Sequence, residues 1–343
     1  MTKILVALSG GVDSAVAAAL LREQGYDTGG ATMLLHSGGE DEAGAARRAA
    51  ERLGVPFYLF RWEDAFEREV VRPFTEVYQN GGTPNPCVFC NKALKFGRFL
   101  DAALELGFDG IATGHYARVE RVDGRFLLKT AHDAGKDQSY MLAGLDQFQL
   151  AHTVLPLGGF CKTEVREFAA KFGLDELERK KDSQDICFVP DGDYLGFLCR
   201  NGLVPQKGNF IGPDGTVLGP HRGFEGYTVG QRRGLGIAAG RRVYVTAKVR
   251  PDIRLGDEDA LYTAGARVDS VNWVRWDTPP VSFRAEVKLR YTARPAPCVV
   301  TPDGAGAVLT FDAPQRAVTP GQTAVFYDGD VVLGSGAILD TEF

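Results

Sequence analysis

A glycine-rich turn between an apolar segment and an alanine-rich segment constrains this chain more than any other feature. Residues 4–8 have the pattern of a buried strand, S-G-G-V-D-S occupies 9–14, and a helix is predicted over 15–24. The two glycines lack a Cβ atom, so backbone N–H groups can come close to a polyphosphate. The helix directs its unpaired N–H groups and positive dipole end at the same anion. This local pattern predicts a phosphate-binding loop in an α/β fold.

The loop also indicates which phosphate bond is broken. The chain contains no G-x-x-x-x-G-K-[ST] motif, so the lysine that grips the β and γ phosphates in γ-phosphoryl transfer is absent. A loop without that lysine suits cleavage of ATP between the α and β phosphates, which yields an adenylated substrate and pyrophosphate. Ser9 and Ser14 supply hydroxyl donors, and Asp13 is predicted to hold Mg²⁺ on the phosphates or to cap the helix. A second S-G-G, at 37–39, has no strand leading into it and is interpreted as an ordinary loop.

Composition narrows the class of protein. The 343 residues are 44% hydrophobic and 24% charged, which is typical of a globular chain with two or three domains. We expect no membrane partner, because no apolar run reaches about 18 residues, and a cytoplasmic location, because the N-terminus lacks a signal-peptide pattern. The six cysteines are expected to be reduced, catalytic or metal-bound. Although the net charge is −5, residues 221–254 carry eight basic and two acidic side chains, which favours a polyanionic partner.

Strand and helix patterns alternate in the first half of the chain. Strands are predicted over 4–8, 28–35, 56–60 and 110–113, with helical patterns between them. Such alternation is typical of a doubly wound parallel sheet, in which the ligand lies beyond the carboxyl ends of the strands. We therefore expect Met33, Gly114 and His115, which follow strand patterns, to lie near the 9–14 loop. The position of Met33 favours contact with an adenine ring.

The pattern changes after about residue 195. Helical alternation stops, and short strand patterns alternate with turns rich in Gly, Pro and Asp. We predict three domains from this change. An ATP pyrophosphatase catalytic domain with a doubly wound parallel sheet covers 1–195, a small β-rich central domain covers 196–260, and a C-terminal antiparallel β-barrel covers 261–343.

Three of the cysteines lie in segments that predict a reactive site. Cys87 and Cys90 lie in a proline-rich loop, T-P-N-P-C-V-F-C-N-K at 83–92, just before a predicted helix. The helix start and Lys92 are expected to lower a thiol pKa there. Cys187 lies in another polar stretch, D-S-Q-D-I-C-F. A pyrophosphate loop together with reactive thiols suggests that an oxygen is activated by adenylation and then replaced by sulfur.

The other three cysteines have no such context. Cys161, Cys199 and Cys298 lie among apolar or strand residues and are expected to be buried, inert thiols.

Five motifs carry a resemblance to a known family. S-G-G-V-D-S, T-P-N-P-x-x-x-C-N, G-H-Y-A, K-D-Q-S-Y and S-Q-D-I-C-F occur in this order, and G-Y-T-V-G-Q-R-R-G-L-G at 226–236 and L-R-Y at 289–291 accompany them. The combination resembles the bacterial tRNA-specific 2-thiouridylases over essentially the whole chain. The resemblance implies ATP-dependent 2-thiolation of the wobble uridine of tRNA, with sulfur received from a relay protein or a cysteine desulfurase. We expect a monomer whose barrel contacts tRNA.

The resemblance also implies roles for individual residues. ATP would be bound by Ala7, Leu8, Ser9, Gly10, Gly11, Val12, Asp13, Ser14, Met33 and Gly114. Cys187 would carry a persulfide, and Cys90 would attack it. The target base, swung out of the anticodon stack, would lie against Asn85, Pro86 and Cys87. Contacts with the tRNA are implied for His115, Lys136, Asp137, Gln138, Arg290, Tyr291 and Gln322.

One departure from the family pattern leaves two mechanisms open. Many members have an aspartate, the family's candidate general base, where this chain has Cys87. Three thiols, those of Cys87, Cys90 and Cys187, could therefore bind an iron–sulfur cluster whose free iron holds a hydrosulfide. The alternative is the persulfide route, in which Cys90 and Cys187 close a disulfide. A structural zinc at Cys87 and Cys90 would lack its remaining ligands.

Two other functions share parts of this pattern. A ligase that adenylates a small molecule would use the 9–14 loop but would not need Cys90 or Cys187. A non-enzymatic RNA-binding module with a degenerate nucleotide fold would need neither the loop chemistry nor the thiols. Cysteine substitution separates the first from a thiolating enzyme, and pyrophosphate release separates the second.

Overall fold

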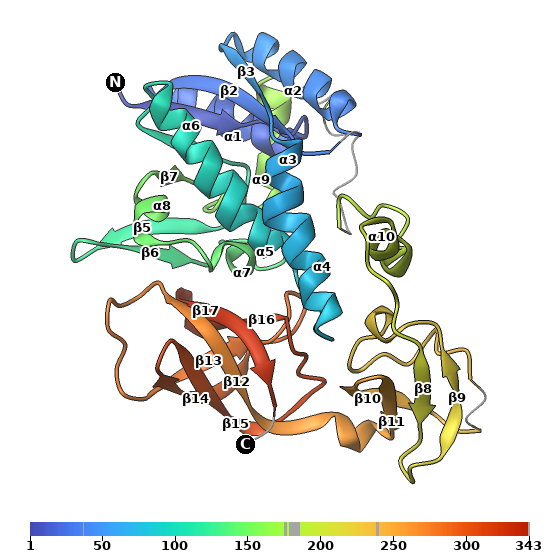
Figure 1. Ribbon diagram of the computed structural model, residues 1–343. Helices are drawn as coiled ribbons and strands as arrows, with labels where there is room; N and C mark the ends of the chain where they lie inside the picture. Colours follow the sequence, from blue (N-terminus) through green and yellow to red (C-terminus); the bar gives the residue numbers. More distant parts are fainter. Residues whose placement is uncertain (37, 175–176, 178–185, 238–239, 342–343) are drawn as a thin grey trace.

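Three β-sheets organise the chain. The computed structural model describes residues 1–36, 38–174, 177, 186–237 and 240–341. A parallel sheet at the N-terminal end, a small sheet in the middle of the sequence and a C-terminal barrel form three lobes (Figure 1). This architecture confirms the predicted fold class.

The parallel sheet has five strands. They are β1 (Lys3–Ala7), β2 (Asp27–Leu34), β3 (Phe57–Arg61), β4 (Gly110–Ala112) and β7 (Thr153–Val154). Their order is β3-β2-β1-β4-β7, and every neighbouring pair is parallel. The chain moves outward from β1 in one direction to β2 and β3, and then returns to β4 on the other side. The carboxyl ends of β1 and β4 therefore flank the switch point, where α/β sheets bind ligands.

Both faces of the parallel sheet are buried. Along β1, Ile4 and Val6 pack into one core with α1 (Val12–Glu23), α2 (Glu40–Leu53) and α9 (Lys162–Lys171). Leu5 points to the opposite face and packs into a second core that extends to the C-terminal barrel. This alternation follows from the two-residue period of a strand. It explains why the strands of this sheet read as continuous apolar runs.

Two long helical runs cover the second face and the edge of the sheet. The first consists of α3 (Glu63–Phe66), η1 (Glu67–Val71) and α4 (Arg72–Gln79). The second consists of α5 (Pro86–Cys90), η2 (Asn91–Arg98) and α6 (Phe99–Glu105). In each run the middle segment is π-helical, a geometry that is common at functional sites. Figure 1 shows the two runs side by side in front of the sheet.

The second run begins earlier than predicted. The sequence predicts a loop over 83–92, but the helix starts at Pro86, so that the prediction of a loop around both cysteines is wrong. Asn85 is the N-cap, and its side-chain oxygen accepts a hydrogen bond of 3.1 Å from the backbone N–H of Cys87. Proline at the first helical position loses no hydrogen bond, because a backbone N–H at that position would have no partner within the helix. Cys87 and Cys90 therefore both lie within α5.

The central lobe is a four-stranded sheet. Its strands are β8 (Gly208–Ile211), β9 (Val217–His221), β10 (Tyr244–Val249) and β11 (Asp252–Gly256), in the order β10-β11-β8-β9. Phe210, Tyr227 and Val245 form part of its small core. The helix α10 (Tyr194–Arg200) and the short helix η4 (Phe224–Gly226) lie on the side of this lobe that meets α4.

The C-terminal lobe is a closed antiparallel barrel. Its strands are β12 (Tyr262–Trp273), β13 (Phe283–Lys288), β14 (Ala296–Asp303), β15 (Gly306–Arg316), β16 (Thr323–Asp328) and β17 (Val331–Asp340). Pairing of β12 with β17 closes the barrel. The short helix η5 (Glu258–Leu261) leads into β12.

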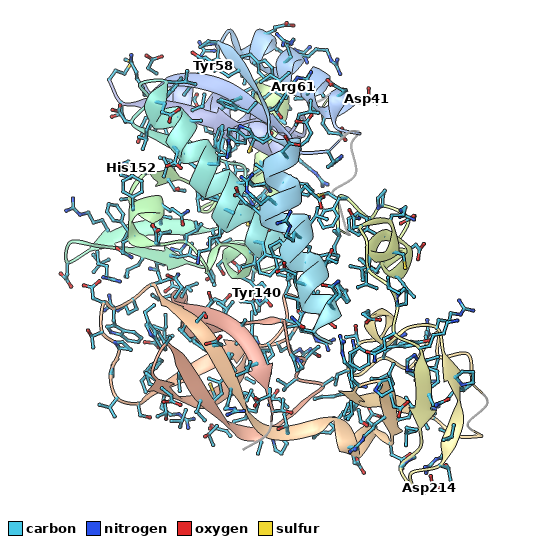
Figure 2. The ribbon with its side chains drawn as sticks, viewed as in Figure 1. Asp41, Tyr58, Arg61, Tyr140, His152 and Asp214 are labelled. Atoms are coloured by element: carbon cyan, nitrogen blue, oxygen red, sulfur yellow. The ribbon has the colours of Figure 1, made fainter. Side chains whose placement is uncertain are left out.

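A hairpin from the N-terminal part of the sequence extends the barrel sheet. It is formed by β5 (Arg118–Val122) and β6 (Arg125–Lys129), and Lys129 pairs with Val331 of β17. Two short helices, α7 (Ser139–Leu142) and α8 (Gln147–Ala151), follow the hairpin. Tyr140 of α7 is fully buried between the lobes and donates a hydrogen bond of 2.8 Å to the carbonyl of Thr323 (Figure 2). The N-terminal lobe and the barrel thus share a core. None of the helices in the described ranges is both long enough and apolar enough to span a bilayer.

Candidate active site

The predicted phosphate-binding loop connects β1 to α1 at the switch point. Ser14 Oγ accepts a hydrogen bond of 3.1 Å from Ser9 N and donates one of 3.0 Å to Gly11 O. Gly10 has a φ of +74°, and a Cβ there would lie 2.8 Å from Ala45 Cβ. Only glycine fits both conditions. The N-cap is Gly11, which has no side chain to occupy the first N–H groups of α1, so the helix start is suited to an anion.

The segment after β4 lies directly against this loop. A Cβ atom on Gly114 would lie 2.8 Å from Ser14 N and 2.9 Å from the carbonyl carbon of Asp13. The structure thus brings Gly114 beside the 9–14 segment, as the parallel topology predicted. Met33 lies in β2, whose residue Ala31 accepts a hydrogen bond of 2.7 Å from Leu8 N. A contact between Met33 and adenine stays a prediction.

A lysine that sequence reasoning missed lies at the loop. Lys162 Nζ is 2.6 and 2.7 Å from the two carboxylate oxygens of Asp13, and Tyr116 donates a hydrogen bond of 2.9 Å to the same carboxylate. The Lys162 side chain is only 13% exposed. Lys162 is the first residue of α9, where a cation opposes the helix dipole. That unfavourable placement was the one sequence signal of a functional lysine.

The carboxylate of Asp13 is already paired in this structure. Both oxygens of the Asp13 carboxylate already accept hydrogen bonds from Lys162. Among the residues that the structure describes, no group of three His, Cys, Asp or Glu side chains is arranged to hold a metal ion. The role of Asp13 as a Mg²⁺ ligand stays a prediction, because Mg²⁺ at a nucleotide site is held largely by the phosphates themselves.

The second part of the site contains three thiols. Cys90 is buried at the end of α5, whereas Cys87 and Cys187 are exposed. The Cys187 segment is held against the helices by its neighbour Phe188, whose ring lies 5.3 Å from that of Phe66. Cys90, Phe66 and Phe188 belong to one apolar cluster. The structure therefore brings residues 90 and 187 into the same region, although residues 183–185 of the S-Q-D-I-C-F motif lie outside the described residues.

The electrostatics of these thiols differ from the prediction. The pKa of Cys90 is raised to about 11. Burial is the largest cause, the charge of Lys95 lowers the pKa, and the neighbouring Cys187 and Cys87 raise it. Desolvation by the surrounding protein also raises the pKa of Cys87 and of Cys187, although each keeps an exposed side. The expectation of a lowered thiol pKa near Lys92 is therefore wrong. The nearby cation is Lys95, and burial outweighs its effect.

The three-thiol cluster stays a prediction, and the structure shows how the thiols lie. All six cysteines lie among the described residues, and none forms a disulfide. The thiols of Cys87, Cys90 and Cys187 are close enough to influence one another's pKa. They are not among any group of three side chains arranged to hold a single metal ion in the described residues, and an iron–sulfur cluster between them is not tested by this arrangement. Of the cysteines expected to be inert, Cys298 is buried, while Cys199 is exposed, contrary to expectation.

His115 is held as a neutral ring between the two halves of the site. Its Nδ1 lies 2.8 Å from Thr113 Oγ1, and its ring centroid lies 5.6 Å from that of Phe96. Burial lowers the pKa of His115 to about 3, and Lys95 lowers it further. The imidazole therefore carries no charge at neutral pH, so it can exchange hydrogen bonds with a ligand but cannot neutralise a phosphate.

Three family models match the chain in the same order as its lobes. They are described as a tRNA methyl transferase HUP domain over residues 2–191, a tRNA methyl transferase PRC-barrel domain over 196–252 and an aminomethyltransferase β-barrel domain over 263–338. The chain is 46% identical to the tRNA-specific 2-thiouridylase MnmA of Halothermothrix orenii, with 98% of this chain and 99% of that protein aligned. The protein with the same name from Carboxydothermus hydrogenoformans is 45% identical, with 98% of this chain and 97% of that protein aligned.

This chain belongs to the tRNA-specific 2-thiouridylase family. A third relative, the tRNA-specific 2-thiouridylase MnmA 1 of Clostridium botulinum strain Loch Maree, is 43% identical, with 98% of this chain and 99% of that protein aligned. Because the alignments cover nearly the whole of both chains, the resemblance inferred from five motifs is confirmed.

Several residues that the 2-thiouridylase resemblance links to tRNA have structural partners in this chain. The Asp137 carboxylate is buried and accepts hydrogen bonds from Ala131 N, Ser139 N and Ser139 Oγ. Gln138 Oε1 accepts one of 2.9 Å from Tyr116 N, and Lys136 N donates to the carbonyl of Asp133. The K-D-Q segment therefore fixes the turn that holds Tyr116 against Asp13. Its contacts with tRNA stay predictions.

The barrel residues in the same set connect the lobes. Gln322 Nε2 donates a hydrogen bond of 2.6 Å to the carbonyl of Thr83, at the start of the T-P-N-P segment. Arg290 Nη2 donates a hydrogen bond of 3.1 Å to the carbonyl of Val229 in the central lobe, and the Tyr291 hydroxyl donates one of 3.2 Å to the carbonyl of Asp137. These side chains connect the barrel to the central lobe and to the segments that precede α5 and α7. Whether they also bind tRNA stays a prediction.

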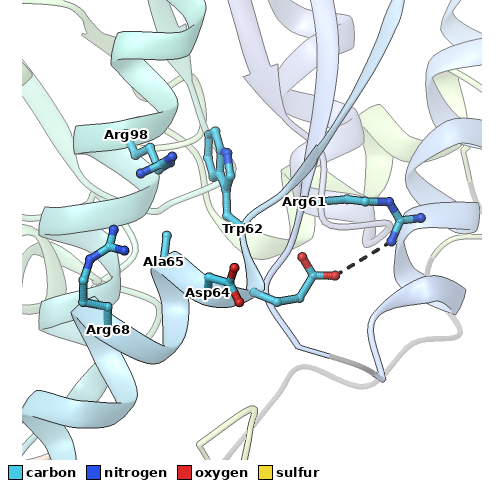
Figure 3. Close-up of a pocket in the computed structure, with 7 residues that line it drawn as sticks. Arg61, Trp62, Asp64, Ala65, Arg68 and Arg98 are labelled. Atoms are coloured by element: carbon cyan, nitrogen blue, oxygen red, sulfur yellow. Dashed lines mark ion pairs between the residues drawn. The ribbon is translucent and has the colours of Figure 1, made fainter.

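A polar cavity adjoins the apolar cluster that contains Cys90. It has a volume of about 540 Å³ and is lined by Trp62, Ala65, Arg68 and Arg98 among others (Figure 3). Trp62 and Ala65 also pack into the apolar cluster that contains Cys90. None of the residues predicted to bind ATP lines it, and binding of ATP at the 9–14 loop stays a prediction.

Proposed function

We propose that this protein catalyses ATP-dependent 2-thiolation of the wobble uridine of tRNA, with AMP and pyrophosphate as products. The observation that carries the proposal is the placement of a phosphate-binding loop and two motif cysteines on one catalytic lobe of a 2-thiouridylase family member. Substrate, donor and residue roles follow from the resemblance and the chemistry of the site.

The first step activates the uracil oxygen. The uracil O2 attacks the α-phosphorus of ATP, pyrophosphate leaves, and the N3 proton is lost, which gives a neutral O2-adenylate. The glycine loop and the first turn of α1 supply backbone N–H groups for the departing phosphates. Lys162 brings a cation to the loop through its contact with Asp13, and Tyr116 keeps Asp13 oriented.

The second step exchanges oxygen for sulfur. A persulfide on Cys187 attacks C2, and AMP leaves with the former uracil oxygen. The Cys90 sulfur then attacks Cys187 Sγ, releases 2-thiouridine and closes a disulfide, which an external thiol must reduce before the next turnover. Cys187 is exposed, which suits loading by a sulfur relay protein or a cysteine desulfurase. Cys90 is buried with a raised pKa, which suits a thiol that acts only after the substrate has changed its surroundings.

Cysteine substitution tests this assignment. The protein is incubated with ATP, tRNA and a cysteine desulfurase with cysteine, and nucleosides are analysed by mass spectrometry. We expect Cys90→Ser and Cys187→Ser to abolish 2-thiouridine while both variants still release pyrophosphate. Cys199→Ser is the matched control, because Cys199 is an exposed thiol on α10 and should retain full activity. Undiminished thiolation in both site variants would contradict the proposal.

A further inference from the structure

Asn91 is a buried side chain with one unused hydrogen-bonding atom. It follows Cys90 directly and is 2% exposed. Its Nδ2 donates a hydrogen bond of 3.1 Å to the carbonyl of Met141. Because only the amide nitrogen can donate to a carbonyl, this bond fixes which way the amide of Asn91 points. Its Oδ1 is buried and accepts no hydrogen bond from any residue in the described ranges. Native proteins rarely leave a buried acceptor in this state, because its desolvation is uncompensated.

The position of this acceptor distinguishes it from the other unpaired buried atoms. Asn91 lies about one helical turn after Cys87 and one turn before Lys95. Met141 also connects it to the N-cap of α5, because Asn85 Nδ2 lies 3.6 Å from the Met141 sulfur. The two asparagines thus hold the same residue of α7, which lies beside α5 in Figure 1. Asn85 belongs to the segment expected to face the target base.

The other buried side-chain atoms without a partner in the described residues lie elsewhere. They are Thr28 Oγ1 in β2, and Gln206 Oε1 and His221 Nδ1 in the central lobe. Asn91 is therefore the member of this group that adjoins the thiols. A fixed acceptor at this position can be paired by a ligand that presents a single N–H group.

Uracil and cytosine differ at the atom that such an acceptor would meet. Uracil carries a hydrogen on N3, whereas N3 of cytosine is an unprotonated acceptor that an amide oxygen repels. We propose that Asn91 Oδ1 accepts a hydrogen bond from N3–H of the target uracil and thereby selects uridine over cytidine. This inference rests on the proposed function. The contact acts on the uridine as it first binds, because the N3 proton is lost when the adenylate forms.

Binding of two RNA hairpins tests the inference. Synthetic anticodon stem-loops that differ only in a wobble uridine or cytidine are titrated against the full chain without ATP. We expect the wild-type protein to prefer the uridine hairpin by about tenfold or more, because the cytidine leaves the Asn91 acceptor facing another acceptor. Asn91→Leu keeps the branching and the number of heavy atoms of the side chain but removes the acceptor, so it should bind both hairpins within about twofold.

Asn272→Leu is the matched control. Asn272 also donates through its amide to backbone carbonyls just after α7, at 3.0 Å to Ala143 and 2.9 Å to Leu145. Its removal disturbs the same segment but leaves the Asn91 acceptor in place. We expect the uridine preference to persist in this variant.

The outcomes separate the inference from the proposed function. A wild-type protein that thiolates uridine but binds both hairpins equally, or an Asn91→Leu variant that keeps the preference, would overturn the role of Asn91 alone. Failure of the wild-type protein to form 2-thiouridine would overturn the function itself. If Asn91→Leu does not fold, a hairpin with 3-methyluridine gives the test on wild-type protein. Its binding should be about tenfold weaker than that of uridine, and equal binding would refute the inference.

Discussion

Replacing Gly114 by alanine tests whether the close approach of β4 to α1 shapes the ATP site. The new methyl carbon would lie 2.8 Å from Ser14 N and 2.9 Å from the carbonyl carbon of Asp13. Both are backbone atoms at the start of a helix, so neither can rotate away as a side chain could. The added methyl group must therefore move one segment relative to the other.

The size of the movement sets the size of the effect. Ordinary van der Waals contact begins at 3.4 Å, so the two segments must separate by about 0.6 Å. Hydrogen bonds of about 2.9 Å from the loop to phosphate would then lengthen to about 3.5 Å, where they lose most of their strength. Two weakened bonds to a charged group, together with a misplaced α-phosphate, predict a loss of about 10- to 100-fold in kcat/KM for ATP.

Pyrophosphate release at saturating tRNA measures this loss. Gly159→Ala is the matched control, because a Cβ atom at Gly159 meets no atom within 4 Å. We expect Gly159→Ala to have wild-type kinetics, and we expect both variants to bind a tRNA anticodon hairpin as the wild-type protein does. A Gly114→Ala protein with an unchanged kcat/KM for ATP would refute the reasoning, because it would show that the loop does not depend on this contact.

Two further predictions concern charged groups of the site. Lys162→Met should reduce pyrophosphate release at least tenfold, because it removes the cation beside the loop and leaves the Asp13 carboxylate without its ion pair; unchanged release would exclude a role for Lys162. As the pH is lowered, His115 should reduce the free energy of unfolding. Its folded-state pKa of about 3 lies below the unfolded value of 6.5, so the unfolded chain binds the proton first. Between pH 8 and pH 5 this loss should be about 2 kcal/mol in urea unfolding and absent in His115→Gln; equal pH dependence of the two proteins would contradict the assignment.

Local features of the site could be predicted from the sequence. The strand, the glycine turn and the helix around 9–14 are adjacent in the chain, so their geometry depends on residue type and spacing. The parallel order of the strands follows from their alternation with helices, and it correctly placed Gly114 near the loop. Even the start of α5 had a local signal, because Asn85 followed by Pro86 is a strong N-terminal pair.

Features that depend on distant segments could not be predicted in this way. The hairpin β5–β6 extends the barrel because Lys129 meets Val331, about two hundred residues later in the chain. Asn91 shows the same dependence, since its amide is oriented by a carbonyl from α7. Neither segment carries a sequence mark of its partner.

The chain by itself therefore determined the phosphate loop, the order of the lobes and the family. Tertiary structure decided the charges of the site. Neighbouring residues suggested an activated thiol at Cys90, but packing against Phe66 and Phe188 buries it and raises its pKa. Likewise, Asp13 is neutralised by Lys162, a residue from a helix much later in the sequence. Burial and ion pairing arise only when distant segments pack together, because the water that a group loses is displaced by atoms remote from it in sequence.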